Sequence, residues 1–219
     1  MEKVKVFFKK VFTKENLKAF FFSFVWLGVL VFVADIVSKW MIVKALKDNP
    51  AEVMVIKDFF SICFITNDGA AFSLGSDMRI FWIIVSILLS AALIVYYIKK
   101  FKTLTRWMRV SFILMIAGAF GNLIDRCFYW ENTVGFSGVI DWIWLNIPII
   151  DSTRFNIADA SLVVGVGILL VIIIVDLVKE ALNKTDKENA QLKLKNDQQK
   201  PDENEKSPAI PGQNEEENK

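Results

Sequence analysis

The sequence predicts an all-α membrane protein with four transmembrane helices. Hydrophobic residues make up 54% of the 219 residues, which is too apolar for a soluble domain of this size. Four long stretches also contain no Asp, Glu, Lys or Arg, and each approaches the roughly 20 residues that cross a hydrocarbon core. These stretches are residues 19–34, 80–98, 110–124 and 160–175.

The first apolar stretch follows a basic segment, as a signal peptide would. It is long and rich in aromatic residues, and it lacks a small-x-small cleavage motif before Asp35, so we expect a retained helix. Basic residues also crowd the connection between the second and third stretches, and the positive-inside bias places both basic regions in the cytoplasm. With four spans, the N-terminus and the C-terminus are both expected inside.

Two longer connections, about residues 36–79 and 126–158, are then expected outside. The first contains strand-like runs at 53–56 and 59–66, followed by the turn signal Asn67-Asp68-Gly69, which predicts a small extracytoplasmic β-sheet.

The second connection contains another strand-like run at residues 138–144. Its Trp142 and Trp144 are of the ring type found at headgroup depth, so this loop is expected to rest on the membrane. Cys63 and Cys127 lie in the two connections. A disulfide between them is geometrically possible in an oxidising exterior, but lone cysteine pairs in membrane proteins are more often small apolar residues, so we favour two free thiols.

The domain organisation follows from these segments. Residues 1–18 form a basic cytoplasmic N-terminus, residues 19–178 the four-helix domain, and residues 179–219 a charged cytoplasmic tail. The tail continues as a helix to about residue 196 and is too polar to bury a core from Pro201 onward, so part of it is expected to be disordered. The net charge of +2 implies no nucleic-acid partner.

The chain contains no histidine, so histidine-dependent catalysis and imidazole metal sites are excluded. Carboxylates are therefore the leading groups for proton chemistry. Counting about 1.5 Å per helical residue from the cytoplasmic boundary places Asp35, Asp125 and Asp159 at similar depth near the outer surface of the bilayer. A carboxylate at this depth either caps a helix or faces the bundle interior and serves function.

The neighbours of two aspartates favour a functional reading. Asn122 precedes Asp125 by three residues, and Asn156 precedes Asp159 by three, so each helix presents an amide one turn from a carboxylate. Two aspartates in hydrogen-bond reach share a proton, and one can act as base while the other acts as acid. This suits amide hydrolysis by water, but it suits a proton relay in a transporter equally well.

Three blocks of sequence resemble the signature blocks of the lipoprotein signal peptidase (signal peptidase II) family. They are Asn67-Asp68-Gly69-Ala70-Ala71-Phe72-Ser73, Gly121-Asn122-Leu123-Ile124-Asp125-Arg126 and Phe155-Asn156-Ile157-Ala158-Asp159-Ala160. The resemblance covers about residues 19–178. It implies a membrane aspartyl endopeptidase that removes the signal peptide from diacylglyceryl-modified prolipoproteins by cleaving just before the lipidated cysteine.

The resemblance also implies roles for particular residues. Asp125 and Asp159 would form the catalytic dyad that activates water, with Asn122 and Asn156 orienting them. Support and substrate-positioning roles would fall to Asn67, Arg126 and Asp141, and Asp35 with Lys39 would form an i, i+4 ion pair that stabilises the first helix and supports the site. Asp141 departs slightly from the family pattern, because Trp142 follows it.

No metal or organic cofactor is required by this reading. The expected partners are prolipoprotein signal peptides and membrane lipids, the expected state is a monomer, and the expected location is the bacterial cytoplasmic membrane with the site at its extracytoplasmic face. A non-enzymatic lipoprotein chaperone is a third class of function; it would bind precursor without forming product.

Overall fold

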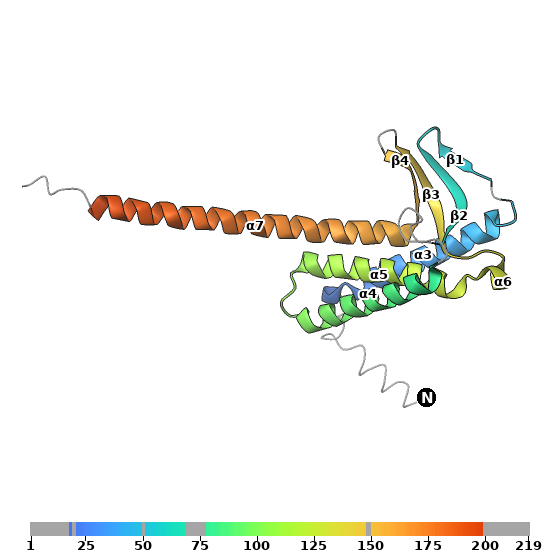
Figure 1. Cartoon of the computed structure of the whole chain (residues 1–219), viewed down its shortest axis with the longest axis horizontal. Helices are drawn as coiled ribbons and strands as arrows, with labels where there is room; N and C mark the ends of the chain where they lie inside the picture. The colour runs from blue at the N-terminus through green and yellow to red at the C-terminus, as the bar shows by residue number, and fades with distance from the viewer. Residues whose placement is uncertain (1–17, 19–20, 50, 69–77, 148–149, 199–219) are drawn as a thin grey trace, which may run out of the picture. The chain divides into compact units, whose positions relative to one another are not determined.

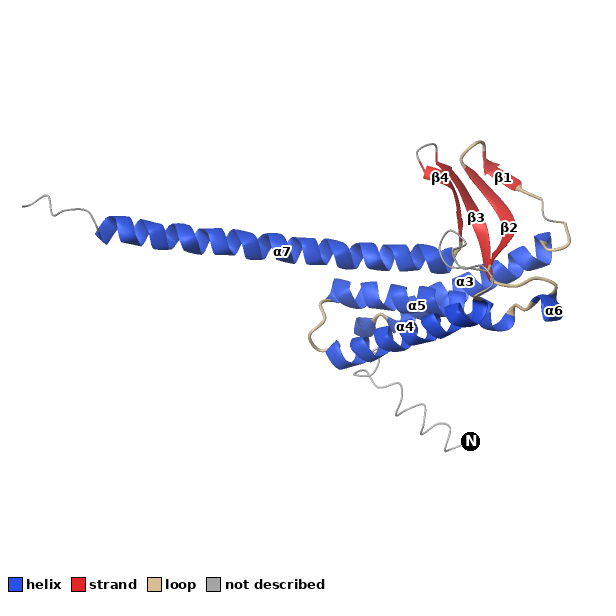
Figure 2. Cartoon of the chain, viewed as in Figure 1, coloured by secondary structure: helices blue, strands red, loops and turns tan. Residues whose placement is uncertain are grey.

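The structure is a computed structural model that describes residues 18, 21–49, 51–68, 78–147 and 150–198. It is mostly helical, with a small sheet (Figures 1 and 2). Within the described residues, four helices are long and apolar enough to cross a membrane, as the sequence predicts. They are α3 (Val25–Leu46), α4 (Arg79–Lys100), α5 (Arg106–Phe128) and α7 (Ile157–Gln198).

Helix α5 is the most enclosed of the four spans. In its most apolar window 56% of the residues are buried, against 11% in each of the other three. It is capped by Thr105, whose hydroxyl accepts a hydrogen bond from the N–H of Met108 at 3.3 Å. Helices α3 and α4 both pack against it, so side chains on its faces are shielded from lipid as well as from water.

Small residues bring α5 close to its neighbours. A Cβ built on Gly118 would lie 2.3 Å from the carbonyl oxygen of Ala158, and one built on Gly121 would lie 2.6 Å from Asp35 Oδ2. Glycine is therefore required at both positions for the observed approach of the helices. This close packing places Asp35 of α3 and Gly121 of α5 beside Ala158, at the start of α7.

Helix α3 extends further than the apolar stretch that predicts it. It continues to Leu46, because the first strong helix breaker after the apolar stretch is Asn49-Pro50. Asp35 and Lys39 therefore lie within the helix, and the connection that follows α3 starts after Leu46, not near residue 36 as predicted.

The sheet is antiparallel, in the order β1-β2-β3-β4. Its strands are β1 (Val53–Ile56), β2 (Phe60–Asn67), β3 (Val139–Ile147) and β4 (Ile150–Phe155). The first three match the predicted strand-like runs, whereas β4 is not predicted by the sequence analysis. Strands β2 and β3 contact α3, so the sheet lies at one end of the helices (Figure 1).

A β-bulge in β2 determines which side chains of β2 lie on the same face of the sheet as Asp141. Ile62 pairs with Ile143, but Ile65 pairs with Asp141, so β2 contains one extra residue between these pairs. A one-residue shift moves every later side chain to the other face. The bulge therefore turns Asn67, in place of Thr66, toward the face that carries Asp141.

The chain divides into two compact units, residues 1–173 and 174–219. The first contains α3 to α5, the sheet, the short helix α6 (Glu131–Val134) and the apolar part of α7. The second contains the charged continuation of α7, which reaches Gln198 and so agrees with the predicted end near residue 196. The predicted disorder from Pro201 lies outside the described residues.

Cys63 and Cys127 are both free thiols.

Candidate active site

The start of α7 is built as a reciprocal capping pair. Asn156 lies just before the first residue of the helix, and its side-chain oxygen accepts the N–H of Asp159 at 2.8 Å. In return, Asp159 Oδ2 accepts the N–H of Asn156 at 3.3 Å. This arrangement satisfies two otherwise unpaired donors at the helix start. It fixes the rotamers of both side chains, so the Asn-x-x-Asp spacing has a structural cause.

The amide of Asn156 also reaches across the site. Its Nδ2 donates to Asp141 Oδ1 at 2.8 Å, to Asn122 Oδ1 at 3.2 Å and to the carbonyl oxygen of Ile140 at 3.2 Å. Asn156 has no solvent-exposed surface. It therefore joins α7, β3 and α5 at one point.

Asn122 carries this network from α5 to Asp159. Its Nδ2 donates to Asp159 Oδ1 at 2.7 Å. Its Oδ1 accepts from Asn156, as above, and from Lys39 Nζ at 3.2 Å. Asp159 is thus held through both oxygens, while its side chain keeps partial exposure.

Asp141 lies on β3 and is 4% exposed. Besides its contact with Asn156, its Oδ2 accepts from Asn67 Nδ2 at 3.4 Å. Burial, followed by the negative charge of Asp159, raises the pKa of Asp141 to about 7, against the lowering effect of the hydrogen bonds from Asn67 and Asn156. Asp141 and Asp159 therefore interact electrostatically, and Asp141 can carry a proton near neutral pH.

Asp125 has a different environment. It has no solvent exposure, and its Oδ2 lies 2.7 Å from Lys39 Nζ. The same oxygen accepts the N–H of Ile140 at 3.2 Å. Asp125 is thus an ion-paired, fully enclosed carboxylate.

Lys39 has a second carboxylate partner on its own helix. Its Nζ lies 2.7 Å from Asp35 Oδ2, which is the i, i+4 pair that the sequence predicts. Asp35 Oδ1 also accepts the N–H of Ala158 at 2.8 Å. Both side chains are fully buried, although the sequence analysis placed them at the outer end of the helix.

Arg126 lies beside this cluster at the end of α5. Its backbone oxygen accepts two hydrogen bonds from the Arg79 guanidinium, at 2.8 Å from Nε and 2.6 Å from Nη2. Arg79 stacks on Trp130 at 4.1 Å. The start of α4 is therefore fixed to the end of α5, next to the carboxylates.

Hydrogen bonds and ion pairs thus connect eight of the nine predicted site residues, and Arg126 adjoins them. What the sequence analysis missed is the contribution of two backbone groups, the N–H groups of Ile140 and Ala158, and the contact between Lys39 and Asp125. No local spacing signals either, because each joins segments that are far apart in the chain. Among the described residues, no group of three or more His, Cys, Asp and Glu side chains is arranged to hold a metal ion.

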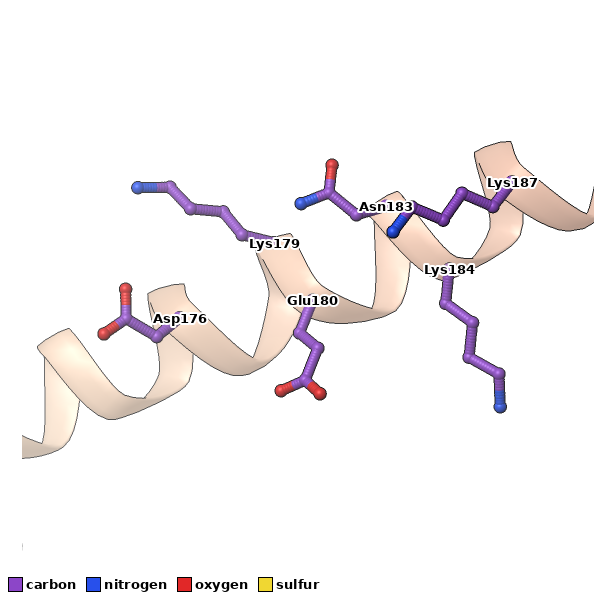
Figure 3. Close-up of a pocket in the computed structure, with 6 residues that line it drawn as sticks. All are labelled: Asp176, Lys179, Glu180, Asn183, Lys184 and Lys187. Atoms are coloured by element: carbon purple, nitrogen blue, oxygen red, sulfur yellow. The ribbon is translucent and has the colours of Figure 1, made fainter.

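A shallow depression occurs on the charged continuation of α7. Figure 3 shows its six side chains standing out from a single helix, with Lys179 and Asn183 on one side and Glu180 and Lys184 on the other. Oppositely charged residues at i, i+3 and i, i+4 spacing are typical of a solvated helix surface. We assign this surface no part in catalysis. The six residues are Asp176, Lys179, Glu180, Asn183, Lys184 and Lys187.

The fold and the cluster define a multi-pass membrane protein with a buried centre of carboxylates and amides. A family model described as signal peptidase (SPase) II matches residues 27–175. The chain belongs to the signal peptidase II family.

Relatives and solved structures agree with this assignment. The chain is 36% identical over 171 residues to a lipoprotein signal peptidase of Staphylococcus aureus, covering 78% of this chain and 97% of the relative. The corresponding protein of S. aureus strain JH9 is 35% identical over the same shares. A solved structure described as a bacterial membrane enzyme is 33% identical, with a TM-score of 0.61 over 70% of this chain and 88% of that chain. The resemblance inferred from the sequence blocks is therefore confirmed, and the chain is a multi-pass bacterial membrane peptidase.

Proposed function

We propose that this chain is an aspartic endopeptidase that removes the signal peptide from diacylglyceryl-modified prolipoproteins, cleaving just before the lipidated cysteine. Membership of the signal peptidase II family supports the substrate class. The observation that carries the aspartic mechanism is the chain of hydrogen bonds that joins Asp141 to Asp159 through the amides of Asn156 and Asn122. Burial and the nearby charge of Asp159 also raise the pKa of Asp141 to about 7.

The environments of the carboxylates favour Asp141 and Asp159 as the reacting pair. A general base needs access to a water molecule, and Asp159 is partly exposed. Asp125 has no exposure and is ion-paired with Lys39 at 2.7 Å. We therefore propose Asp141 as the partner of Asp159. The pairing of Asp125 with Asp159, inferred from the sequence, stays a prediction that the experiments below can test.

The proposed reaction uses one proton shared between two carboxyl groups. The ionised carboxylate accepts a proton from water, whose oxygen attacks the carbonyl carbon of the scissile amide. The protonated carboxyl group donates its proton to the carbonyl oxygen. The tetrahedral intermediate then collapses and the C–N bond breaks. The leaving nitrogen of the lipidated cysteine takes the proton that the first carboxyl group accepted from water, and a hydroxyl group of the intermediate returns its proton to the other carboxylate.

The remaining site residues hold this pair in place. Asn122 and Asn156 donate to Asp159 and Asp141 and so fix the direction of their oxygens. Asn67 supports Asp141 from β2. We propose that Arg126 positions the substrate beside the carboxylates.

We further propose that both termini are cytoplasmic and that the site faces the extracytoplasmic side of the bacterial cytoplasmic membrane. The basic connection between α4 and α5 supports this orientation. The sheet would then lie outside, with the second outer connection resting on the membrane. The proposed division is a peptidase domain at residues 19–178 between cytoplasmic segments 1–18 and 179–219, acting as a monomer in contact with lipid and without a cofactor.

The test is cleavage of a diacylglyceryl-modified precursor by the purified protein, with the product masses measured. We expect one cut, before the lipidated cysteine, and no product from Asp141→Asn or Asp159→Asn. Ser90→Ala is a matched control, because Ser90 is 2% exposed and its hydroxyl makes no hydrogen bond within the part of the chain that the structure describes. Full activity of a folded Asp141→Asn or Asp159→Asn variant would refute the proposed pair.

A further inference from the structure

A buried group of three charges links α3 to α5. Lys39 Nζ lies 2.7 Å from Asp35 Oδ2 and 2.7 Å from Asp125 Oδ2. None of the three side chains has any exposed surface. Taking such charges out of water is unfavourable unless ion pairing and hydrogen bonding compensate. We refer to Asp35, Lys39 and Asp125 as the ion triad.

Each carboxylate of the ion triad also accepts one backbone N–H from another element. Asp35 Oδ1 accepts from Ala158 at 2.8 Å, and Asp125 Oδ2 accepts from Ile140 at 3.2 Å. Ala158 immediately precedes Asp159, and Ile140 immediately precedes Asp141. The two ends of the triad therefore hold the backbone next to the two proposed reacting groups.

The lysine at the centre of the triad also orients an amide. Lys39 Nζ lies 3.2 Å from Asn122 Oδ1. An ammonium group can only donate hydrogen bonds, so the oxygen of the Asn122 amide must face it. The NH₂ group of Asn122 is thereby directed to Asp159 Oδ1 at 2.7 Å.

We propose that the ion triad is a positioning device that sets the separation of Asp141 and Asp159 by holding the backbone N–H before each. This inference rests on the proposed function of that pair. Lys39 holds Asp35 and Asp125 at a fixed separation. Because each carboxylate accepts a backbone N–H from the strand or helix that bears a reacting group, that separation also fixes the distance between Asp141 and Asp159. A displacement of about 1 Å at reacting groups can cost on the order of 100-fold in rate, so such a device has a measurable effect on turnover.

The test compares two substitutions of Asp125. Both of its contacts use Oδ2, whereas Oδ1 makes no hydrogen bond within the described residues. In Asp125→Asn the amide oxygen can therefore keep both contacts, whereas Asp125→Ala loses them. We expect Asp125→Asn to retain about one tenth or more of the wild-type kcat and Asp125→Ala to fall about 100-fold, with KM changed by less than about threefold in both.

Asp35→Asn provides a second comparison with the same change of charge. Asp35 uses one oxygen for Lys39 and the other for Ala158, so an amide at this position must turn its nitrogen toward one of these two donors. We expect Asp35→Asn to have a lower kcat than Asp125→Asn. This comparison also replaces Asp125→Ala if that variant does not fold. Thermal unfolding in detergent, with Ser90→Ala as reference, gives the folded fraction of each variant.

Several outcomes would overturn the positioning role. Equal kcat for folded Asp125→Asn and Asp125→Ala, or for Asp35→Asn and Asp125→Asn, would reduce the triad to a structural ion pair. Complete loss of cleavage in folded Asp125→Asn would indicate that Asp125 itself reacts. An active Asp141→Asn variant would refute Asp141 and Asp159 as the reacting pair. An inactive Asp141→Asn variant together with a fully active Asp125→Ala variant would refute only the positioning role of the ion triad.

Discussion

Replacing Asn156 separates its two tasks, because the side chain caps α7 with its oxygen and supports Asp141 with its nitrogen. Asn156→Ser keeps an oxygen for the cap and loses the NH₂ group, whereas Asn156→Ala loses both. A helix cap contributes about 0.5–2 kcal/mol, and a hydrogen bond to a charged group about 1.5–3 kcal/mol. We therefore expect Asn156→Ala to lower the free energy of unfolding by about 2–5 kcal/mol, and Asn156→Ser to recover the part due to the cap.

The same substitutions change the pH dependence of cleavage. The hydrogen bond from Asn156 lowers the pKa of Asp141, against burial and the charge of Asp159, which raise it to about 7. Losing the bond raises that pKa further. If Asp141 donates a proton in the reaction, activity falls as pH rises through its pKa, so the alkaline limb of the rate profile moves upward in Asn156→Ser, by about one pH unit.

The assay is the initial rate of cleavage of a lipidated precursor over a pH series, for wild type, Asn156→Ser and Asn156→Ala at equal amounts of folded protein. An alkaline limb that stays in place in Asn156→Ser, or that moves to lower pH, would refute the assignment of the proton to Asp141. A limb that moves equally in both variants, with only the stability differing, is the expected result.

Two other predictions concern single contacts and one concerns the tail. Asn67→Ala removes a hydrogen bond that lowers the pKa of Asp141, so the alkaline limb of its rate profile also moves upward. Gly121→Ala places a Cβ 2.6 Å from Asp35 Oδ2; thermal unfolding should show a loss of about 1–3 kcal/mol, and unchanged stability would contradict the packing. Deleting residues 183–219 should leave cleavage intact, and a large fall in kcat would give the tail a role.

The sequence predicts the fold best where apolar residues form continuous stretches along the chain. Four uncharged apolar stretches predict the four long helices, and short apolar runs predict β1 to β3 within a few residues at each end. Such patterns depend only on local spacing. The strand β4 is missed because residues 150–155 mix charged and apolar side chains without a clear period.

The site shows the limit of the same reasoning. Counting residues along the helices predicts the same membrane depth for Asp35, Asp125 and Asp159, so it cannot tell which of them react. It also does not show that α3 covers Asp125 and pairs it with Lys39. Asp141 lies in the connection between two membrane-spanning helices, α5 and α7, and a carboxylate in such a connection is usually solvated. Its burial depends on contacts from β2 and α7, which are distant in the chain and so leave no local signal.

The most direct test of the proposed pair compares Asp141→Asn with Asp125→Asn, two substitutions that make the same chemical change in neighbouring buried carboxylates. Single-turnover cleavage of a lipidated precursor is measured at neutral pH for both variants, at matched folded amounts. The account predicts no product from Asp141→Asn and slow but complete conversion by Asp125→Asn. Cleavage by Asp141→Asn, with none by Asp125→Asn, would contradict it and return the catalytic role to Asp125.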